Sequence, residues 1–137
     1  MTRRSPIPND LDKPFLDACN EDRLIVQYCS ACDQFQFPPE ASCNGCDSAD
    51  NFAWREVSGR GTIYSYGVVY DTPIASLHED LPFNAVVIDI DDCPGINMMT
   101  YLPGTPVDEV PIGAQVDVIF VPTAATGQKV PEWQVIR

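Results

Sequence analysis

The chain has 137 residues, of which 20 are acidic and 8 are basic, and its formal net charge at pH 7 is -12. This length builds one ordinary domain, or a small domain with a metal-stabilised extension, and the apolar fraction of 45% is normal for a folded protein. The negative charge repels phosphate backbones and anionic membranes, which argues against a nucleic-acid-binding or membrane-surface protein. Residues 1–8 carry two arginines without an apolar stretch, so we expect no signal peptide and a cytoplasmic location.

A short helix is expected after Asn9 and Asp10, whose side chains can cap it. Its apolar residues fall on or near one face, which should pack against the rest of the chain or against another protein. These residues are Leu11, Phe15, Leu16 and Cys19.

Two Cys-x-x-Cys pairs, Cys29/Cys32 and Cys43/Cys46, follow the helix and are separated by ten residues. Each pair can present two thiolates to one ion, and two facing pairs complete a tetrahedral sulfur site that suits zinc. Two disulfides, or a ribbon that no longer binds metal, are the alternatives, although the expected reducing compartment favours thiols. Four sulfur ligands leave no open position, so we expect one structural Zn²⁺ per chain.

The segments around these pairs have the pattern of a zinc ribbon, in which two hairpins carry the ligands in their turns. Residues 24–28 predict a strand that enters the first pair, and residues 35–37 alternate between the pairs. Phe52, Trp54 and Val57 predict a further strand beyond the second pair.

From residue 59 onward the chain is predicted to be all-β, with Gly67 able to permit a bend and residues 83–90 apolar enough for burial on both faces. Five strands with one long connection before the fourth agree with a small Greek-key barrel of the OB type. We therefore expect a mostly β protein with a helix and zinc ribbon over residues 1–58 and the barrel over residues 59–137. The five strands are expected at residues 62–70, 83–90, 96–102, 114–121 and 133–136.

Titratable groups outside the cysteine pairs do not form a catalytic motif. Cys93 precedes Pro94-Gly95, where we expect an exposed turn, but no local pattern supports a dyad with the single histidine, His78. Glu79 and Asp80 next to His78 predict a solvated loop tip rather than an acid–base site. Asp89, Asp91 and Asp92 likewise predict a polar turn, without the spacing of a calcium loop. We expect no catalytic residue in this chain.

Strand alternation predicts that Tyr64, Tyr66 and Tyr70 share one face. Packing on the barrel or against the ribbon is the expected role, with a protein interface or a nucleic-acid stacking platform as alternatives. A stacking platform needs a basic groove, and Arg55 and Arg60 are nearly alone beside these tyrosines.

An ordered set of short motifs runs through most of the chain, and singly each motif is modest. In this order they resemble the DUF35 family, in which a rubredoxin-like zinc ribbon is joined to an OB-fold. Asp33 stands where the family usually has glycine, Glu40 where arginine is common, and Asn44 where proline is frequent. These changes spare the metal ligands but remove any contact of that arginine with an anionic ligand or partner. The motifs are Cys29-x-x-Cys32, Phe37-Pro38-Pro39, Cys43-x-x-Cys46, Trp54-x-x-Val57-Ser58-Gly59-x-Gly61-Thr62-Ile63-Tyr64-Ser65, Leu81-Pro82-Phe83, Val86-Val87-Ile88-Asp89-Ile90 and Ile112-Gly113-Ala114-Gln115-Val116.

The resemblance implies a non-catalytic accessory subunit that binds a thiolase-like partner in a hetero-oligomer and supports its acyl-CoA reaction. That reaction would include retro-aldol cleavage of a steroid side-chain acyl-CoA. The helix and ribbon would dock the partner, and the barrel would lie beside the substrate channel. A nucleic-acid-binding module is one alternative, and it needs a basic stripe. A stand-alone acyl-CoA-binding protein is the other, and it needs a local basic cluster such as Arg55 and Arg60.

Overall fold

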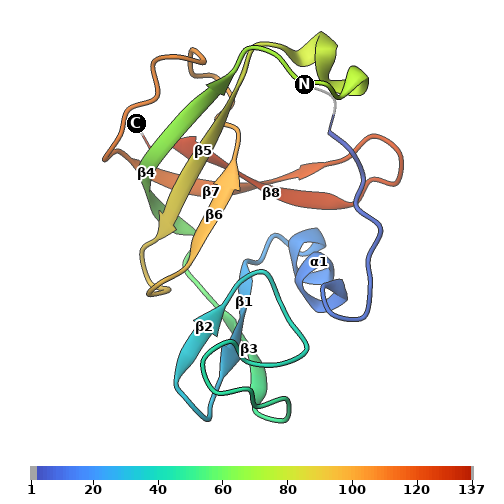
Figure 1. Cartoon of the computed structure of the whole chain (residues 1–137), viewed down its shortest axis with the longest axis vertical. Coiled ribbons are helices and arrows are strands. Elements are labelled where there is room, and N and C mark those ends of the chain that lie inside the picture. The colour runs from blue at the N-terminus through green and yellow to red at the C-terminus, as the bar shows by residue number, and fades with distance from the viewer. Residues whose placement is uncertain (1–2, 137) are drawn as a thin grey trace.

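The computed structural model describes residues 3–136, which form two antiparallel sheets, one α-helix and one 3-10 helix (Figure 1). The three-stranded sheet has the order β2-β1-β3 and the five-stranded sheet has the order β6-β5-β4-β7-β8. The predicted mostly β fold is confirmed. Its elements are α1 (Lys13–Asn20), β1 (Ile25–Cys29), β2 (Gln34–Gln36), β3 (Phe52–Glu56), β4 (Arg60–Val69), η1 (Ala75–Asp80), β5 (Phe83–Ile90), β6 (Asn97–Thr100), β7 (Gln115–Pro122) and β8 (Lys129–Val135).

The five-stranded sheet curls into a nearly closed barrel with the predicted OB topology. Strands β4, β5 and β6 form a meander, and the chain then crosses over so that β7 pairs with the beginning of β4. Strand β8 pairs with β7 along its whole length and returns toward β6. This crossover makes the Greek key, and the remaining gap in the barrel lies between β6 and β8.

The N-terminal segment bridges the gap between β6 and β8. The Arg3 guanidinium donates hydrogen bonds from Nη2 to the Tyr101 hydroxyl at 2.7 Å and to Glu132 Oε1 at 2.8 Å. It also lies over the Tyr101 ring, 5.3 Å from the centroid, and Glu132 is only 6% exposed. Ser5 Oγ adds a bond to Thr123 Oγ1 at 2.7 Å. These contacts fasten the segment across the open edge of the barrel.

One hydrophobic core runs through both sheets and includes the inner face of α1. Trp133, Ile63 and Ile88 are the largest fully buried side chains of the barrel. Gly61 lies against them, and a Cβ there would be 2.5 Å from Ile88 Cγ2 and 2.8 Å from the Asp89 carbonyl oxygen. Only glycine permits this close approach of β4 to β5.

The apolar face of the helix packs on its own chain. Phe15, Leu16, Ala18 and Cys19 are buried, and α1 contacts β8 as well as β1. The helix begins at Lys13, later than expected, because Asn9 Oδ1 accepts the backbone N–H groups of residues 11 and 12 and forms a separate turn. Leu11 lies in this turn and is exposed, contrary to the predicted apolar face.

Two strands differ from the prediction because pairing, rather than local composition, sets their length and burial. In β5 buried and half-buried residues alternate, so that only one face lies in the core instead of both. The last strand begins at Lys129 rather than Trp133, because β8 pairs with β7 as far as Pro122.

A β-bulge in β4, together with the end of this strand at Val69, overturns the predicted shared face of the three tyrosines. The ladder with β5 shifts register between Ile63 and Ser65 and runs regularly through Gly67, where the bend was expected. The extra residue reverses the alternation. Tyr66 therefore pairs with buried Val86, packs against the core and donates its hydroxyl to a backbone carbonyl, whereas Tyr64, before the bulge, is 65% exposed. Tyr70 follows the last residue of β4 and is 68% exposed. The three rings form no common platform.

Candidate metal centre

The two cysteine pairs meet at the end of the ribbon remote from the barrel, with Cys29 at the end of β1 and Cys32 in the following turn. Cys43 and Cys46 come from the loop between β2 and β3. All four Sγ atoms lie within 4.8 Å of one another, with Cys29–Cys46 at 3.7 Å and Cys32–Cys43 at 3.4 Å. Tetrahedral zinc with Zn–S bonds of about 2.3 Å places its sulfurs roughly 3.8 Å apart. The four cysteines are thus positioned to bind one metal ion.

The disulfide alternative is wrong, because all six cysteines are free thiols. Bonded sulfurs would be about 2.05 Å apart. The site also provides four sulfur ligands and no additional group, which is the composition of a closed structural centre. Cys29 and Cys43 are buried, whereas Cys46 is exposed at the surface.

The backbone of the second pair is arranged to favour a thiolate. The Gly45 N–H donates to Cys43 Sγ at 3.3 Å. Together with the N–H of Cys46 it lowers the pKa of the Cys43 thiol to about 7, because hydrogen bonds to the charged form stabilise it. A Cβ at Gly45 would be 2.6 Å from Gln34 Oε1, so a larger residue there would displace the end of that exposed side chain.

Each pair is followed by an aspartate in the left-handed backbone region. Asp33 has φ of 57° and Asp47 has φ of 60°. This conformation normally favours glycine, and aspartate is among the few other residues that adopt it readily. The departure of Asp33 from the glycine of the resembled family is therefore accommodated without a change in the turn.

Two buried glutamines support the loop that carries the second pair, and sequence analysis missed both. Gln36 Oε1 accepts the Asn44 N–H at 2.8 Å, and Gln36 Nε2 donates to the Ser42 carbonyl at 3.2 Å. Gln27 exchanges two hydrogen bonds with the backbone of Glu40, at 2.9 and 3.0 Å, and accepts a third from Gln36 at 3.2 Å. The one signal for each glutamine in the sequence is that it is a polar residue between apolar strand residues. That pattern normally predicts a side chain facing solvent, which is why these two were missed.

The structure rules out a dyad of Cys93 and His78. His78 lies in η1 before β5, and Cys93 lies in the turn after it, so eight strand residues and roughly 25 Å separate them (Figure 1). Cys93 is fully buried instead of exposed, because the turn folds it under Ile96, whose N–H it binds. Burial raises the pKa of the Cys93 thiol to about 12, which leaves it an unreactive core residue.

The acidic turn residues are engaged in local hydrogen bonds. Asp91 Oδ1 accepts the Thr62 hydroxyl at 2.9 Å, and Asp92 accepts the Ser58 N–H at 2.8 Å. Asp89 accepts the side-chain amide of Asn97. Within residues 3–136, only the four cysteines are arranged to hold a metal ion.

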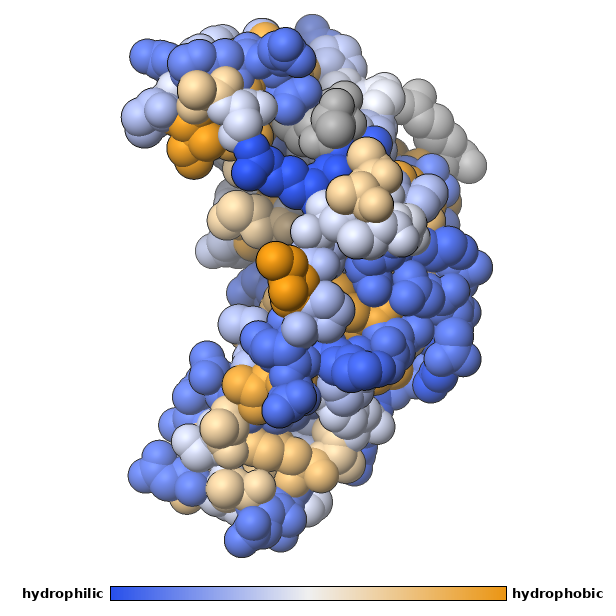
Figure 2. Space-filling view, turned by 90° about the vertical axis from the view of Figure 1, so that its right-hand side faces the viewer, coloured by the Kyte–Doolittle hydropathy of each residue, from blue (hydrophilic) through white to orange (hydrophobic). Residues whose placement is uncertain are grey.

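The arginines do not form the basic groove that a nucleic-acid-binding barrel needs. Arg55 stacks on Tyr28, with its guanidinium 3.4 Å from the ring centroid, and Arg60 lies 3.6 Å from Asp117. The face over the N-terminal segment and α1 is mostly hydrophilic, with apolar side chains in separate spots (Figure 2). Neither helix found between residues 3 and 136 has the length and apolar character needed to cross a membrane.

Comparison with known families assigns both parts of the chain. Residues 16–52 match the ChsH2 rubredoxin-like zinc ribbon domain, and residues 54–121 match the ChsH2 C-terminal OB-fold domain. A probable enoyl-CoA hydratase alpha subunit of Thermomonospora curvata is 29% identical over 83% of this chain, which spans only 34% of that protein. A DUF35 domain-containing scaffold protein of Methanocaldococcus jannaschii is 27% identical over 71% of this chain and 67% of its own length.

Two solved structures resemble the whole fold. A chain of the Ltp2-ChsH2(DUF35) aldolase superimposes with a TM-score of 0.78 and 25% identity, over 96% of this chain and 98% of that one. A DUF35 protein of unknown function from Sulfolobus solfataricus has a TM-score of 0.59 and 18% identity, over 90% and 84% of the two chains. With a zinc ribbon followed by an OB-fold barrel, the chain belongs to the ChsH2 family of DUF35 proteins.

Proposed function

We propose that this chain is a non-catalytic accessory subunit that binds a thiolase-like enzyme and supports its reaction on an acyl-CoA. The observation that carries the proposal is the similarity over 96% of this chain and 98% of a chain of the Ltp2-ChsH2(DUF35) aldolase. A match along both chains supports the same kind of role more strongly than a match confined to the zinc ribbon, which recurs among unrelated proteins.

The chemistry of the side chains agrees with a supporting role. The best-formed cluster of reactive groups in the described part of the chain is a four-sulfur centre that leaves no position for substrate. Cys19 and Cys93 are buried, and His78 is committed to the Thr72 carbonyl at 2.8 Å. A nucleophile or general base for acyl-CoA chemistry is therefore expected in the partner.

For the partner's reaction we propose retro-aldol cleavage of a steroid side-chain β-hydroxyacyl-CoA. In this step a base removes the hydroxyl proton, and the bond between the α and β carbons breaks. The products are a ketone or aldehyde and a shorter acyl-CoA, whose α carbon receives a proton. The aldolase name of the similar structure and the enoyl-CoA hydratase name of the similar sequence support an acyl-CoA substrate.

Affinity capture of the tagged full chain from its native host, with mass spectrometry of the proteins that elute, tests the proposal. We expect a stoichiometric thiolase-like protein. The purified pair should then convert a β-hydroxyacyl-CoA into a carbonyl compound and a shorter acyl-CoA, whereas this chain alone should not. Turnover by the isolated chain, or capture of nucleic acid instead of a protein, would refute the proposal.

A further inference from the structure

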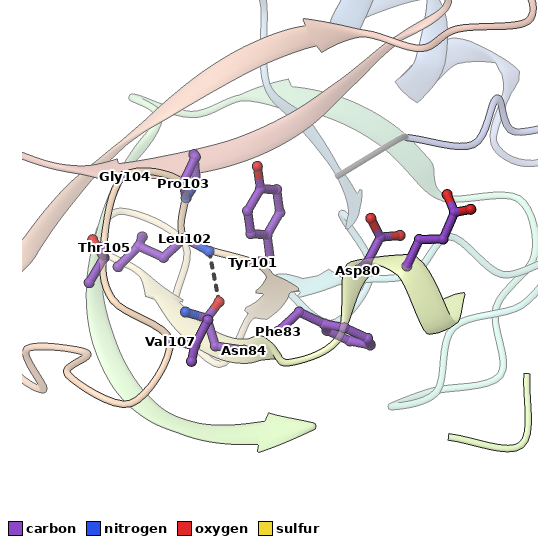
Figure 3. A pocket seen from close by; sticks show the side chains of 10 residues that line it. Asp80, Phe83, Asn84, Tyr101, Leu102, Pro103, Gly104, Thr105 and Val107 are labelled. Atoms are coloured by element: carbon purple, nitrogen blue, oxygen red, sulfur yellow. Dashed lines mark hydrogen bonds between the residues drawn. The ribbon is translucent and has the colours of Figure 1, made fainter. Parts of the chain in front are cut away.

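A cavity of about 290 Å³ opens on the barrel between η1 and the loop after β6 (Figure 3). Phe83, Asn84 and Tyr101 contribute side chains from the β5 and β6 region, and Asp80 stands on η1 at one side. The loop of residues 102–105 forms the opposite side. Ligand pockets for small molecules are usually about 300–1,000 Å³. This cavity is therefore the size of one side chain rather than of a CoA molecule.

Asn84 is the feature that points to a ligand. Its side chain is buried, with 2% of the residue exposed, and Oδ1 is fixed by the N–H of Leu102 at 3.0 Å. This bond sets the orientation of the amide. Nδ2 forms no hydrogen bond within residues 3–136, and because no fully enclosed side-chain atom there lacks a partner, Nδ2 keeps contact with solvent. The amide group thus presents free N–H donors in the cavity that it lines (Figure 3). An amide donor that only solvent satisfies can instead bind an acceptor oxygen of a group that enters this space.

The remaining walls indicate that the group that enters is also cationic. Glu79 and Asp80 line the cavity, and neither forms an ion pair within the described residues. The rings of Phe83 and Tyr101 lie beside them. Tyr101 already receives one guanidinium, that of Arg3, over its ring. Carboxylates combined with aromatic rings suit a planar guanidinium better than an ammonium.

We propose that this cavity receives an arginine side chain of the partner subunit. The guanidinium would lie beside Glu79 and Asp80 and stack on an aromatic ring, and a backbone carbonyl next to that arginine would accept the Asn84 Nδ2 donor. The inference rests on the proposed function for the identity of the partner. Acidic groups at the entrance disfavour the phosphates of CoA, which separates this site from an acyl-CoA site.

An apolar strip beside the cavity extends the surface that the partner would cover. Leu77, Phe83, Ala85 and Met99 line a shallow depression that shares Phe83, Asn84 and Tyr101 with the cavity. Met99 is 74% exposed, which is unusual for a large apolar side chain. An anchored arginine surrounded by apolar contacts that exclude water is the usual composition of the energetically dominant part of an interface.

The chemistry of the cavity can be tested on the full zinc-loaded chain without the partner. N-acetyl-arginine amide is titrated into ¹⁵N-labelled protein, with N-acetyl-citrulline amide as the neutral probe of nearly equal shape. We expect saturable shifts of the Asn84 side-chain NH₂ and Leu102 amide signals with arginine and not with citrulline. Glu79→Gln/Asp80→Asn should weaken binding about fivefold. The control Glu40→Gln/Asp50→Asn makes the same charge change on exposed ribbon residues and should leave binding unchanged.

Asn84→Asp removes the N–H donor while keeping the hydrogen bond that holds this side chain in the fold. An aspartate oxygen can still accept the Leu102 N–H, but the side chain no longer carries an amide donor. Should this substitution unfold the barrel, the Glu79→Gln/Asp80→Asn variant on the surface still decides the inference. Equal responses to arginine and citrulline, or saturation of the same signals by CoA, would overturn it.

Capture from the host separates the inference from the proposed function. If wild type and Glu79→Gln/Asp80→Asn capture a thiolase-like partner equally well, the arginine site is refuted and the accessory role stands. If wild type captures no partner but Asn84 responds selectively to arginine, the site stands and the accessory role fails.

Discussion

Replacement of Gln36 by methionine should loosen the metal centre without touching a ligand. Methionine has nearly the same length and no amide, so Gln36→Met removes three side-chain hydrogen bonds and little volume. The bonds go to the backbone of Ser42 and Asn44 and to the side chain of Gln27. They hold the loop that places Cys43 opposite the first cysteine pair.

The expected cost follows from these three bonds. Each contributes about 1 kcal/mol net, which sets an upper value of about 3 kcal/mol. Ser42 and Asn44 are exposed, so that water can replace part of their bonding, whereas Gln27 is buried and cannot recover its partner. We therefore expect a loss of about 2 kcal/mol in the free energy of folding the ribbon. Because metal binding and ribbon folding are coupled, zinc affinity should fall roughly 30-fold.

Competition with a chromophoric zinc chelator measures this affinity directly. Gln134→Met provides the matched control, because Gln134 is exposed on β8 of the barrel, far from the four cysteines of the ribbon. This variant should bind zinc as tightly as wild type does. An affinity within threefold of wild type for Gln36→Met would refute the view that the buried glutamines support the centre. Equal losses in both variants would show that the effect is not specific to the loop.

Three further substitutions or conditions test other parts of the fold. Arg3→Ala leaves the buried carboxylate of Glu132 without its guanidinium partner and should lower the free energy of unfolding in urea by about 2 kcal/mol. A further Glu132→Gln change should recover part of this loss. An unchanged urea midpoint would contradict a role for the N-terminal segment in closing the barrel. Asp33→Gly places the preferred residue at φ of 57° and should raise stability by about 0.5 kcal/mol, which a lower melting temperature would disprove. Burial raises the pKa values of Cys19 and Cys93 to about 12, whereas in the unfolded chain these thiols ionise near 9. Their contribution to the free energy of unfolding is thus complete below pH 9. Above pH 9 it should fall by about 1.4 kcal/mol per pH unit for each thiol. Cys93→Ala should reduce this slope when urea unfolding is measured at alkaline pH.

The zinc ribbon and the order of the barrel strands could be predicted from local sequence because both depend on short-range patterns. Two closely spaced Cys-x-x-Cys pairs bring their own ligands together in two turns, and the structure shows the four sulfurs within 4.8 Å. Alternating apolar residues and one long connection were sufficient to predict the OB topology, which the sheet order confirms.

The tyrosine face and the exposed cysteine were predicted incorrectly because both depend on contacts between distant segments. The bulge at Ile63–Ser65 arises in the pairing of β4 with β5 and has no marker in β4 alone. Cys93 is buried because its turn folds back over the barrel core, although the Pro94-Gly95 sequence indicated an exposed turn.

By itself, the sequence determined the metal chemistry, the strand content and the repulsion of polyanions, since these follow from residue type, spacing and summed charge. Only the tertiary structure decided which polar groups are left without partners. Asn84 would be an ordinary strand residue on sequence alone, yet packing buries it, and Leu102 occupies its oxygen while its donor stays free. Gln27 and Gln36 become supports of the metal centre in the same way. Hydrogen bonding of a buried side chain depends on which distant backbone groups the fold brings beside it, and short-range patterns do not encode that arrangement.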